Sequence, residues 1–169
     1  MRRRRVKSKP LRGSHLPVLM RVVPITTGPV LELGCGIYST HYLHWACYSS
    51  QRRLLTCENN PEYFDYIDQF SSESHEIKKV TGPWSEVDLS EPWSVAFVDH
   101  APDDQRWQVI ARLTHAEYVV AHDAEGRSDR AYKYSTIHHL FKYVWKYGGA
   151  YPHTAVYSNF HDLSNFKVV

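Results

Sequence analysis

Short apolar runs alternate along this chain with longer segments in which apolar residues recur every three or four positions. The short runs are typical of buried strands, and the longer spacing is typical of helices that bury one face. The expected strands are 30–33, 53–58, 76–80, 93–99, 117–122, 153–158 and 165–169. The expected helices are 39–49, one that begins at Asn59, 103–114, and a long helix over 129–147 that Gly148-Gly149 ends. Residues 15–23 form either a short helix or an irregular lead-in that covers a ligand site.

Strands that alternate with helices and then close with a hairpin predict a mostly parallel sheet with helices on both faces. The length of 169 residues fits one domain, and 43% hydrophobic and 14% aromatic residues supply its core. We expect this domain to span 15–169, behind a flexible basic arm at 1–14. The sequence has no apolar run of about 18 residues and no signal-peptide pattern. We therefore expect a cytoplasmic protein that neither enters a membrane nor is secreted.

The formal net charge is only +2, but positive charge is concentrated at the start of the chain, in Arg2 to Arg5, Lys7, Lys9 and Arg12. Such an arm can contact the phosphates of a nucleic acid. The alternative is a solubilising tail, which the lack of interleaved aromatic residues favours. The 12 tyrosines and five tryptophans also allow a homodimer face. The three cysteines have no metal-ligand spacing, and their odd number argues against a disulfide framework.

The most specific local feature is a glycine turn, Gly34-Cys35-Gly36, between the strand 30–33 and the helix after it. Gly34 can take a tight turn, and Gly36 allows a ligand to approach the backbone without meeting a Cβ. Ser39 or Thr40 can cap the helix. Glu32 stands two residues before the first glycine, at the carboxyl end of the strand, where a carboxylate can reach a ligand.

On these residues the chain resembles the class I S-adenosylmethionine-dependent methyltransferases, whose first motif reads acidic-x-Gly-x-Gly. The resemblance covers about residues 28–169 and implies a Rossmann-like, doubly wound α/β fold: a mostly parallel seven-stranded sheet with an antiparallel C-terminal strand. It also implies S-adenosyl-L-methionine as cofactor. NAD-binding turns carry a third glycine, and Ser39 at that position makes an NAD-linked enzyme a less favoured alternative.

The end of the second expected strand supplies another cofactor candidate. Glu58 follows Gly36 by 22 residues, and in the resembling family an acid here accepts hydrogen bonds from both ribose hydroxyls; alternatively, its charge interacts with the dipole of the next helix. The family places an adenine-facing loop near 81–85, where Trp84 or Ser85 could face the base, although Trp84 could equally be a core anchor. The expected cofactor-binding residues are Glu32, Gly34, Cys35, Gly36, Ser39, Glu58, Asn59, Trp84, Ser85 and Asp99.

Candidate catalytic residues follow the next two strands. Asp99-His100 ends the strand 93–99, and His122-Asp123 ends the strand 117–122, so all four side chains are expected near one cleft. Asp99 could orient the methionine amine, a water or the acceptor, and His100 or His122 could act as general base. Each histidine could instead fill a polar gap in the structure.

Asp99 and Asp123 also resemble the metal-binding pair of catechol-type O-methyltransferases, although His122-Asp123 replaces that family's Asp-Asn element and removes the amide ligand. Mg²⁺ is possible through the two carboxylates, and a softer metal suits the histidines better. A divalent metal is therefore possible but not favoured.

The preferred interpretation is a methyltransferase that acts on an oxygen or nitrogen of an unidentified acceptor. In the resembling family, an Asn/Asp-Pro-Pro-aromatic motif after the strand that corresponds to 93–99 supports methylation of an exocyclic base nitrogen or an amide nitrogen. The chain has no such motif after the strand 93–99, so the resemblance does not indicate that reaction. Two alternatives stay open: a non-catalytic S-adenosylmethionine-binding or regulatory module, and a nucleic-acid-modifying methyltransferase docked by the basic arm.

Overall fold

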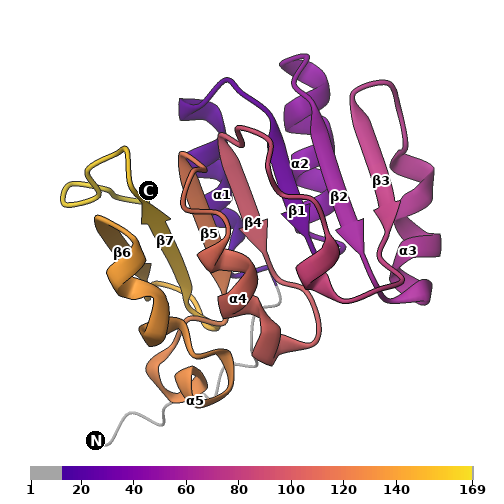
Figure 1. The fold of residues 1–169 in the computed structure, drawn as a ribbon. Helices are drawn as coiled ribbons and strands as arrows, with labels where there is room; N and C mark the ends of the chain where they lie inside the picture. The colour runs from indigo at the N-terminus through magenta and orange to yellow at the C-terminus, as the bar shows by residue number, and fades with distance from the viewer. Residues whose placement is uncertain (1–12, 169) are drawn as a thin grey trace, which may run out of the picture.

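The structure, a computed structural model, describes residues 13–168 and has a twisted seven-stranded sheet at its centre (Figure 1). The strands are β1 (Val30–Leu33), β2 (Leu54–Glu58), β3 (His75–Lys79), β4 (Val95–Val98), β5 (Tyr118–His122), β6 (Tyr143–Tyr147) and β7 (Thr154–Ser158). Their order across the sheet is β3-β2-β1-β4-β5-β7-β6. Strands β1 to β5 pair in parallel, and β7 runs antiparallel to both of its neighbours. The expected mostly parallel sheet with an antiparallel C-terminal strand is confirmed.

Helices cover both faces of this sheet. They are α1 (Leu16–Val22), α2 (Ser39–Ser49), α3 (Pro61–Ile67), α4 (Arg106–Ala111) and α5 (Asp129–Tyr132), and a 3₁₀ segment, η6, spans Tyr134–Leu140. Figure 1 shows α4 in front of the sheet and α1 and α2 behind it. None of the helices in the described part of the chain is long and apolar enough to cross a membrane.

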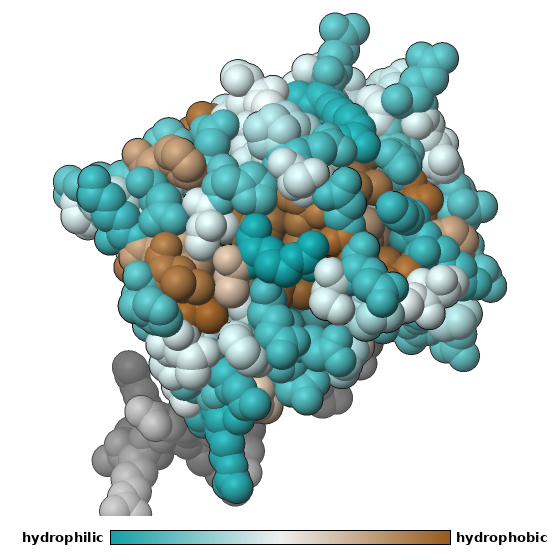
Figure 2. Space-filling model, viewed as in Figure 1, coloured by the Kyte–Doolittle hydropathy of each residue, from teal (hydrophilic) through white to brown (hydrophobic). Residues whose placement is uncertain are grey.

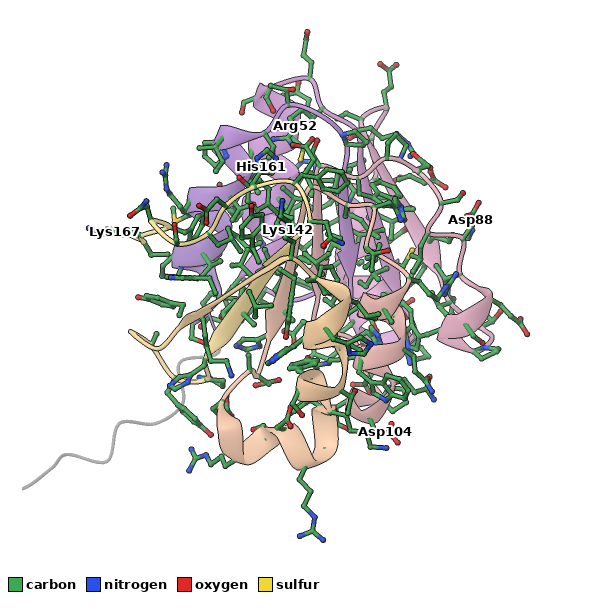
Figure 3. The ribbon with its side chains drawn as sticks, turned by 60° about the vertical axis from the view of Figure 1, so that its left-hand side comes forward. Arg52, Asp88, Asp104, Lys142, His161 and Lys167 are labelled. Carbon is green, nitrogen blue, oxygen red and sulfur yellow. The ribbon has the colours of Figure 1, made fainter. Side chains whose placement is uncertain are left out.

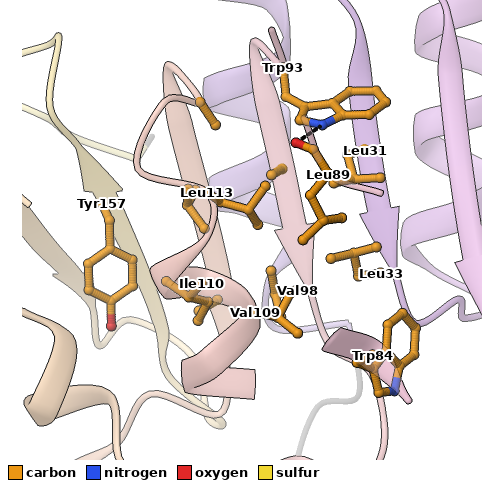
Figure 4. Close-up of a cluster of buried hydrophobic side chains, with 14 of the residues drawn as sticks. Leu31, Leu33, Trp84, Leu89, Trp93, Val98, Val109, Ile110, Leu113 and Tyr157 are labelled. Atoms are coloured by element: carbon orange, nitrogen blue, oxygen red, sulfur yellow. Dashed lines mark hydrogen bonds between the residues drawn. The ribbon is translucent and has the colours of Figure 1, made fainter. Parts of the chain in front are cut away.

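Each face of the sheet has its own apolar cluster, because the strands alternate their side chains between the two faces. On the α4 face, Val109, Ile110 and Leu113 pack over the sheet, and the indole Nε1 of Trp93 donates a hydrogen bond of 3.1 Å to the carbonyl of Leu89 (Figure 4). Figure 2 shows apolar residues in the middle of this face, with polar residues around them.

Two expected elements are wrong. The long helix over 129–147 is absent: α5 stops at Tyr132, and Lys133 adopts a left-handed backbone conformation with φ of 54°. The segment Tyr143–Tyr147 is instead the edge strand β6, since its aromatic and β-branched residues suit a half-buried pleated surface. Residues 165–168 form no strand, and the ring of Phe166 packs against Trp145 with centroids 4.9 Å apart.

The two ends of the parallel strands differ in chemistry. At the amino ends, the guanidinium of Arg52 donates hydrogen bonds to the carbonyls of Val23 and Gly28, both at 2.8 Å. These hydrogen bonds hold in place the segment that connects α1 to β1. Figure 3 shows Arg52 and Asp104 at opposite ends of the molecule, with Asp104 beyond the carboxyl ends of the strands. The polar residues discussed next gather at that carboxyl end.

Candidate functional site

The carboxyl ends of β1, β4 and β5 open into a cleft of about 450 Å³. Open parallel sheets bind ligands at this edge, where strand connections diverge to opposite faces. The cleft is lined by His15, Cys35, Gly36, Ile37, Tyr38, Ser39, Tyr63, Asp99, His122, Asp123 and Pro152. A larger hollow of about 850 Å³ lies near the amino ends of β2 and β3, between the loops 48–51 and 72–74. It lacks the histidine and aspartate groups of the cleft, so the candidate site is the smaller one.

The glycine turn after β1 forms one wall of the cleft, and its two glycines are needed for different reasons. Gly34 has φ of 85°, and a Cβ there would lie 2.5 Å from the backbone of His100, so the fold itself requires glycine. A Cβ on Gly36 would meet nothing closer than the hydroxyl of Ser39, at 3.7 Å. The protein therefore does not need glycine at position 36, and the bare backbone there leaves room for a ligand.

Glu58, at the end of β2, holds this turn in place. Its Oε2 accepts a hydrogen bond of 2.8 Å from the backbone N–H of Cys35, and its Oε1 accepts one of 2.6 Å from the N–H of Asn60. The side chain is almost completely buried. Each carboxylate oxygen can accept a further hydrogen bond, so the ribose contact expected from the sequence stays a prediction.

Glu32 does not reach the cleft, in contrast to the expectation, because its carboxylate lies in the interior of the protein. The hydroxyls of Thr40 and Thr56 donate to it at 3.0 Å and 2.8 Å. Thr40 Oγ1 in turn accepts the backbone N–H of Gly36 at 3.0 Å, so Glu32 supports the glycine turn from behind. Burial raises the pKa of Glu32 to about 7, despite the hydrogen bonds that it accepts.

The same buried chain of hydrogen bonds continues across the sheet. Thr56 Oγ1 lies 2.8 Å from Nε2 of His75 on β3, and Nδ1 of His75 lies 3.0 Å from Nδ1 of His44 on α2. Burial lowers the pKa of His75 to about 4, and the neighbouring His44 lowers it further. The expected helix cap by Ser39 or Thr40 is absent, since Tyr38 occupies the N-cap position without a side-chain bond and Thr40 bonds Gly36 instead.

The residues expected near the adenine lie outside the cleft lining. Trp84 is buried, donates from Nε1 to the carbonyl of Ala101 at 2.7 Å and stacks on His100 with ring centroids 4.0 Å apart. The burial of Trp84 corresponds to its alternative role as a core anchor. The stacking contact also places the ring of His100 away from the cleft. Ser85 is exposed. Asn59 donates from Nδ2 to the same carbonyl of Ala101 at 2.9 Å, which ties the ends of β2 and β4 together.

Beyond the glycine turn, the cleft floor is a cluster of charged side chains. Arg106 extends its guanidinium between Asp99 and Asp123, with N–O distances of 3.0 Å to Oδ1 of Asp99 and to Oδ2 of Asp123. It also donates to the carbonyl of His100 at 2.6 Å. Asp123 has a left-handed backbone with φ of 59°, a conformation that non-glycine residues adopt at a cost. Nδ1 of His122 lies 3.2 Å from Oδ2 of Asp99.

The hydrogen bonds around His122 define its protonation. Ser14 donates its hydroxyl proton to the carbonyl of Pro152 at 2.7 Å, so its oxygen accepts from Nε2 of His122, 2.9 Å away. Since Nδ1 faces the carboxylate of Asp99, this arrangement favours a proton on each ring nitrogen. Burial alone would lower the pKa of His122, but the hydrogen bond to Asp99 and the charges of Asp99 and Asp123 raise it. The same hydrogen bond and the charge of Arg106 lower the pKa of Asp99, against the effect of its burial.

His15, at the start of α1, completes the cluster. Its ring packs against Phe97 on one side and edge-on against His122, with centroids 4.8 Å and 4.7 Å away. Neither ring nitrogen has a hydrogen-bond partner among residues 13–168. Burial lowers the pKa of His15 to about 4, and the charge of His122 adds to this effect, so the imidazole is neutral at pH 7.

Sequence reasoning identified Asp99, His122 and Asp123 but missed Ser14, His15 and Arg106. Ser14 falls within the predicted arm, of which residues 1–12 lie outside the described part of the chain. Arg106 carried a usable signal: it precedes Val109 and Ile110 at helical spacing on the buried stripe of α4. An arginine on an apolar stripe needs buried acceptors, and the acids that follow β4 and β5 provide them.

Comparison with known proteins gives no match to any family model and no match among curated proteins. Several solved structures share the fold. Cofactor-bound Rv0187 from MTB superposes with a TM-score of 0.60 at 17% identity, covering 94% of this chain and 84% of that one. An O-methyltransferase from Bacillus cereus, in complex with SAH, gives 0.60 at 16% identity, covering 90% and 82%. A precorrin-6y C5,15-methyltransferase from Geobacter metallireducens GS-15 gives 0.55 at 11%, covering 89% and 90%.

These similarities establish that the chain has the fold of the class I S-adenosylmethionine-dependent methyltransferases. The names of two of these structures already differ in the methylated position, an oxygen in one and positions C5 and C15 in the other. A shared fold therefore leaves the acceptor open.

Proposed function

We propose that this protein is an S-adenosylmethionine-dependent methyltransferase that acts on an oxygen or nitrogen of a so far unidentified acceptor. The observation that carries the proposal is the continuity of one cleft, which runs from the open backbone of Gly36 to the Asp99–His122 pair. A cofactor held at the first end would present its methyl group toward the second. At about 450 Å³ the cleft falls in the size range of ordinary small-ligand sites.

The cofactor would lie along the glycine turn. The backbone of Cys35 and Gly36 forms the wall, and the bond from Glu58 to the N–H of Cys35 fixes the conformation of that wall before the ligand arrives. Glu58 and Asn59 stand at the end of β2, where the ribose is expected. Such preorganisation favours binding because little conformational entropy is lost when the ligand enters.

Methyl transfer needs an acceptor lone pair in line with the sulfonium carbon. The new oxygen–carbon or nitrogen–carbon bond forms as the sulfur–carbon bond breaks; S-adenosylhomocysteine leaves, and the acceptor loses one proton. Most of the acceleration comes from positioning, with a contribution from a group that takes the proton. His15, Asp99, His122 and Asp123 line the acceptor end of the cleft and supply the polar groups for both tasks.

The first test is calorimetric titration of the full chain with S-adenosylmethionine, S-adenosylhomocysteine and NAD in parallel. We expect the first two to bind with one site per chain and NAD not to bind, because position 39 lacks the glycine of dinucleotide turns. Binding of NAD alone, or of none of the three, would contradict the proposal.

A matched pair of glycine variants locates the site. In Gly36→Ala and in Gly148→Ala the new Cβ would have its nearest neighbour at 3.7 Å, so neither change should destabilise the fold. Only the first adds a methyl group to the cleft wall. We expect Gly36→Ala to weaken S-adenosylmethionine binding at least about tenfold, a loss of about 1.4 kcal/mol, with Gly148→Ala unchanged. Equal affinities in the two variants would show that the cofactor lies elsewhere.

A further inference from the structure

A buried imidazole without a partner is unusual, and His15 is one. Its side chain is only 3% exposed, both of its ring nitrogens lack a hydrogen-bond partner among residues 13–168, and it lines the cleft. A buried polar group of this kind costs free energy unless something binds it. Neither nitrogen is occupied by a protein partner among these residues, so an imidazole nitrogen is available to bind a ligand in the cleft.

Two further donor atoms, from Asp99 and His122, lie close to the imidazole of His15. His15, Asp99 and His122 can each present one ligand atom such that all three lie within 4.8 Å of one another. Nδ1 of His122 and Oδ2 of Asp99 are 3.2 Å apart. Two ligands at about 2.1 Å from one tetrahedral metal ion stand about 3.4 Å apart, so this spacing already suits a shared ion.

Hydrogen bonds and an ion pair from neighbouring residues orient the donor atoms of His122 and Asp99. The chain from Nε2 of His122 through Ser14 to the carbonyl of Pro152 directs Nδ1 of the imidazole toward Asp99 and the cleft. Arg106 holds Oδ1 of Asp99 and leaves Oδ2 free to face His122. Metal-binding histidines and carboxylates are commonly oriented by such outer contacts.

The charges also agree with a bound cation. With both histidines neutral, Asp99, Asp123 and Arg106 leave the cluster with a net charge of −1.

We propose that His15, Asp99 and His122 bind one divalent transition-metal ion, with Zn²⁺ as the expected ion. Two imidazoles and one carboxylate favour such a metal over Mg²⁺, which prefers oxygen ligands. Three protein ligands leave a fourth position, and the cleft gives solvent and small molecules access to it.

The role of the ion rests on the proposed function, whereas its binding does not. An acceptor hydroxyl at the fourth position would lose its proton to solvent more readily, because a bound cation stabilises the alkoxide. The alkoxide oxygen would then take the methyl group as the sulfur–carbon bond breaks. The substrate class is therefore an alcohol or phenol small enough for the cleft.

The test uses the full chain, depleted of metal with a chelator. Calorimetry with Zn²⁺ and with Mg²⁺, together with elemental analysis after dialysis, should give one tightly bound Zn²⁺ per chain and no stoichiometric Mg²⁺. Residues 1–12 contain no histidine, cysteine, aspartate or glutamate, so the arm adds no competing ligands. Titration with Co²⁺ should give the visible absorption of a low-symmetry four- or five-coordinate site.

Substitutions of the proposed ligands test which residues bind the metal ion. We expect His15→Gln and His122→Gln each to weaken Zn²⁺ binding at least about 100-fold, since changes in the outer contacts alone typically cost 10–100-fold. His115→Gln, which changes an exposed histidine, should leave the affinity unchanged. Urea denaturation of each variant checks that the fold persists.

Absence of stoichiometric Zn²⁺ binding, or binding that survives both ligand variants, would overturn this proposal and leave the cluster as an acid–base group. Titration of the same preparation with S-adenosylmethionine separates the two proposals. Cofactor binding without Zn²⁺ would contradict only the metal site, and Zn²⁺ binding without cofactor would contradict only the methyltransferase assignment.

Discussion

Glu32 illustrates how one residue can satisfy a sequence motif without touching a ligand. Its position before the glycine turn is the one expected from the motif, yet its carboxylate is enclosed by Ser39, Thr40 and Thr56 and lies near the charge of Glu58. Its contribution to the cleft is indirect, through the hydroxyl of Thr40 that holds the N–H of Gly36.

The pH dependence of stability should report this burial. The pKa of Glu32 is about 7 in the folded protein and about 4.5 in the unfolded chain, so the folded state binds this proton more tightly. The stabilising contribution is complete below about pH 4.5 and is lost as the pH rises through 7, by an upper limit of about 3 kcal/mol. The lowered pKa of His75 changes stability with the opposite sign over an overlapping range, between about pH 4 and 6.5, so wild type must be compared with a variant.

Glu32→Gln isolates the effect because it removes only this titration. We expect the free energy of unfolding of the variant, relative to wild type, to increase between pH 4.5 and pH 8. Urea denaturation across that range measures the difference, with Glu73→Gln as an exposed control. Curves for Glu32→Gln and wild type that stay parallel would contradict a raised pKa.

At the residue scale, sequence reasoning identified site residues that immediately follow strands. Asp99 and Asp123 were predictable because the end of a parallel strand fixes where the next side chain lies. His15 was not, since it enters the cleft from a helix that precedes the sheet, and its contacts with Phe97 and His122 connect residues far apart in the sequence. Tertiary packing of this kind leaves no local pattern.

At the element scale, α1 is the part of the structure that positions His15. Val18, Leu19 and Val22 are fully buried against the sheet, and His15 stands immediately before the first turn of this helix. The apolar contacts of α1 therefore set the position of an imidazole in the cleft.

Truncating one of these buried side chains should lower the stability of the protein and weaken metal binding at the site. Leu19→Ala is expected to lower the free energy of unfolding by about 2–5 kcal/mol, as for other buried leucines, and to weaken Zn²⁺ binding because His15 moves with the helix. Met20→Ala, in the same helix but 58% exposed, should change neither quantity by much. Denaturation and calorimetry on both variants test this, and equal effects would show that α1 does not position the site.

The elements that sequence reasoning misjudged lie near the C-terminus. The segment 129–147 has apolar residues at helical spacing, but Lys133 breaks the helix and the alternating burial of Tyr143 to Tyr147 fits an edge strand. Pairing with β7 decides this outcome, and such pairing is non-local. By contrast, β1, β2, β4 and β5 were predictable because buried parallel strands are continuous apolar runs.

At the scale of the whole molecule, the basic arm and the cleft should act separately. The residues of the cleft lie within 13–168, and positive charge concentrates before them. Deleting residues 1–12 should leave the affinity for S-adenosylmethionine unchanged. If the arm docks a nucleic acid, the full chain should bind one with an affinity that falls steeply with salt, and the deletion should abolish that binding. Weaker cofactor binding after the deletion would contradict this separation.

The contact from Ser14 to Pro152 sets the order in which the protein can become functional during synthesis. The two residues are separated by 138 positions, yet both are needed to hold His122 in place. A nascent chain that has emerged only through Asp123 contains the glycine turn and both aspartates but lacks the carbonyl of Pro152 that anchors the serine. The hydrogen-bond chain that orients His122 can therefore form only after residue 152 has left the ribosome.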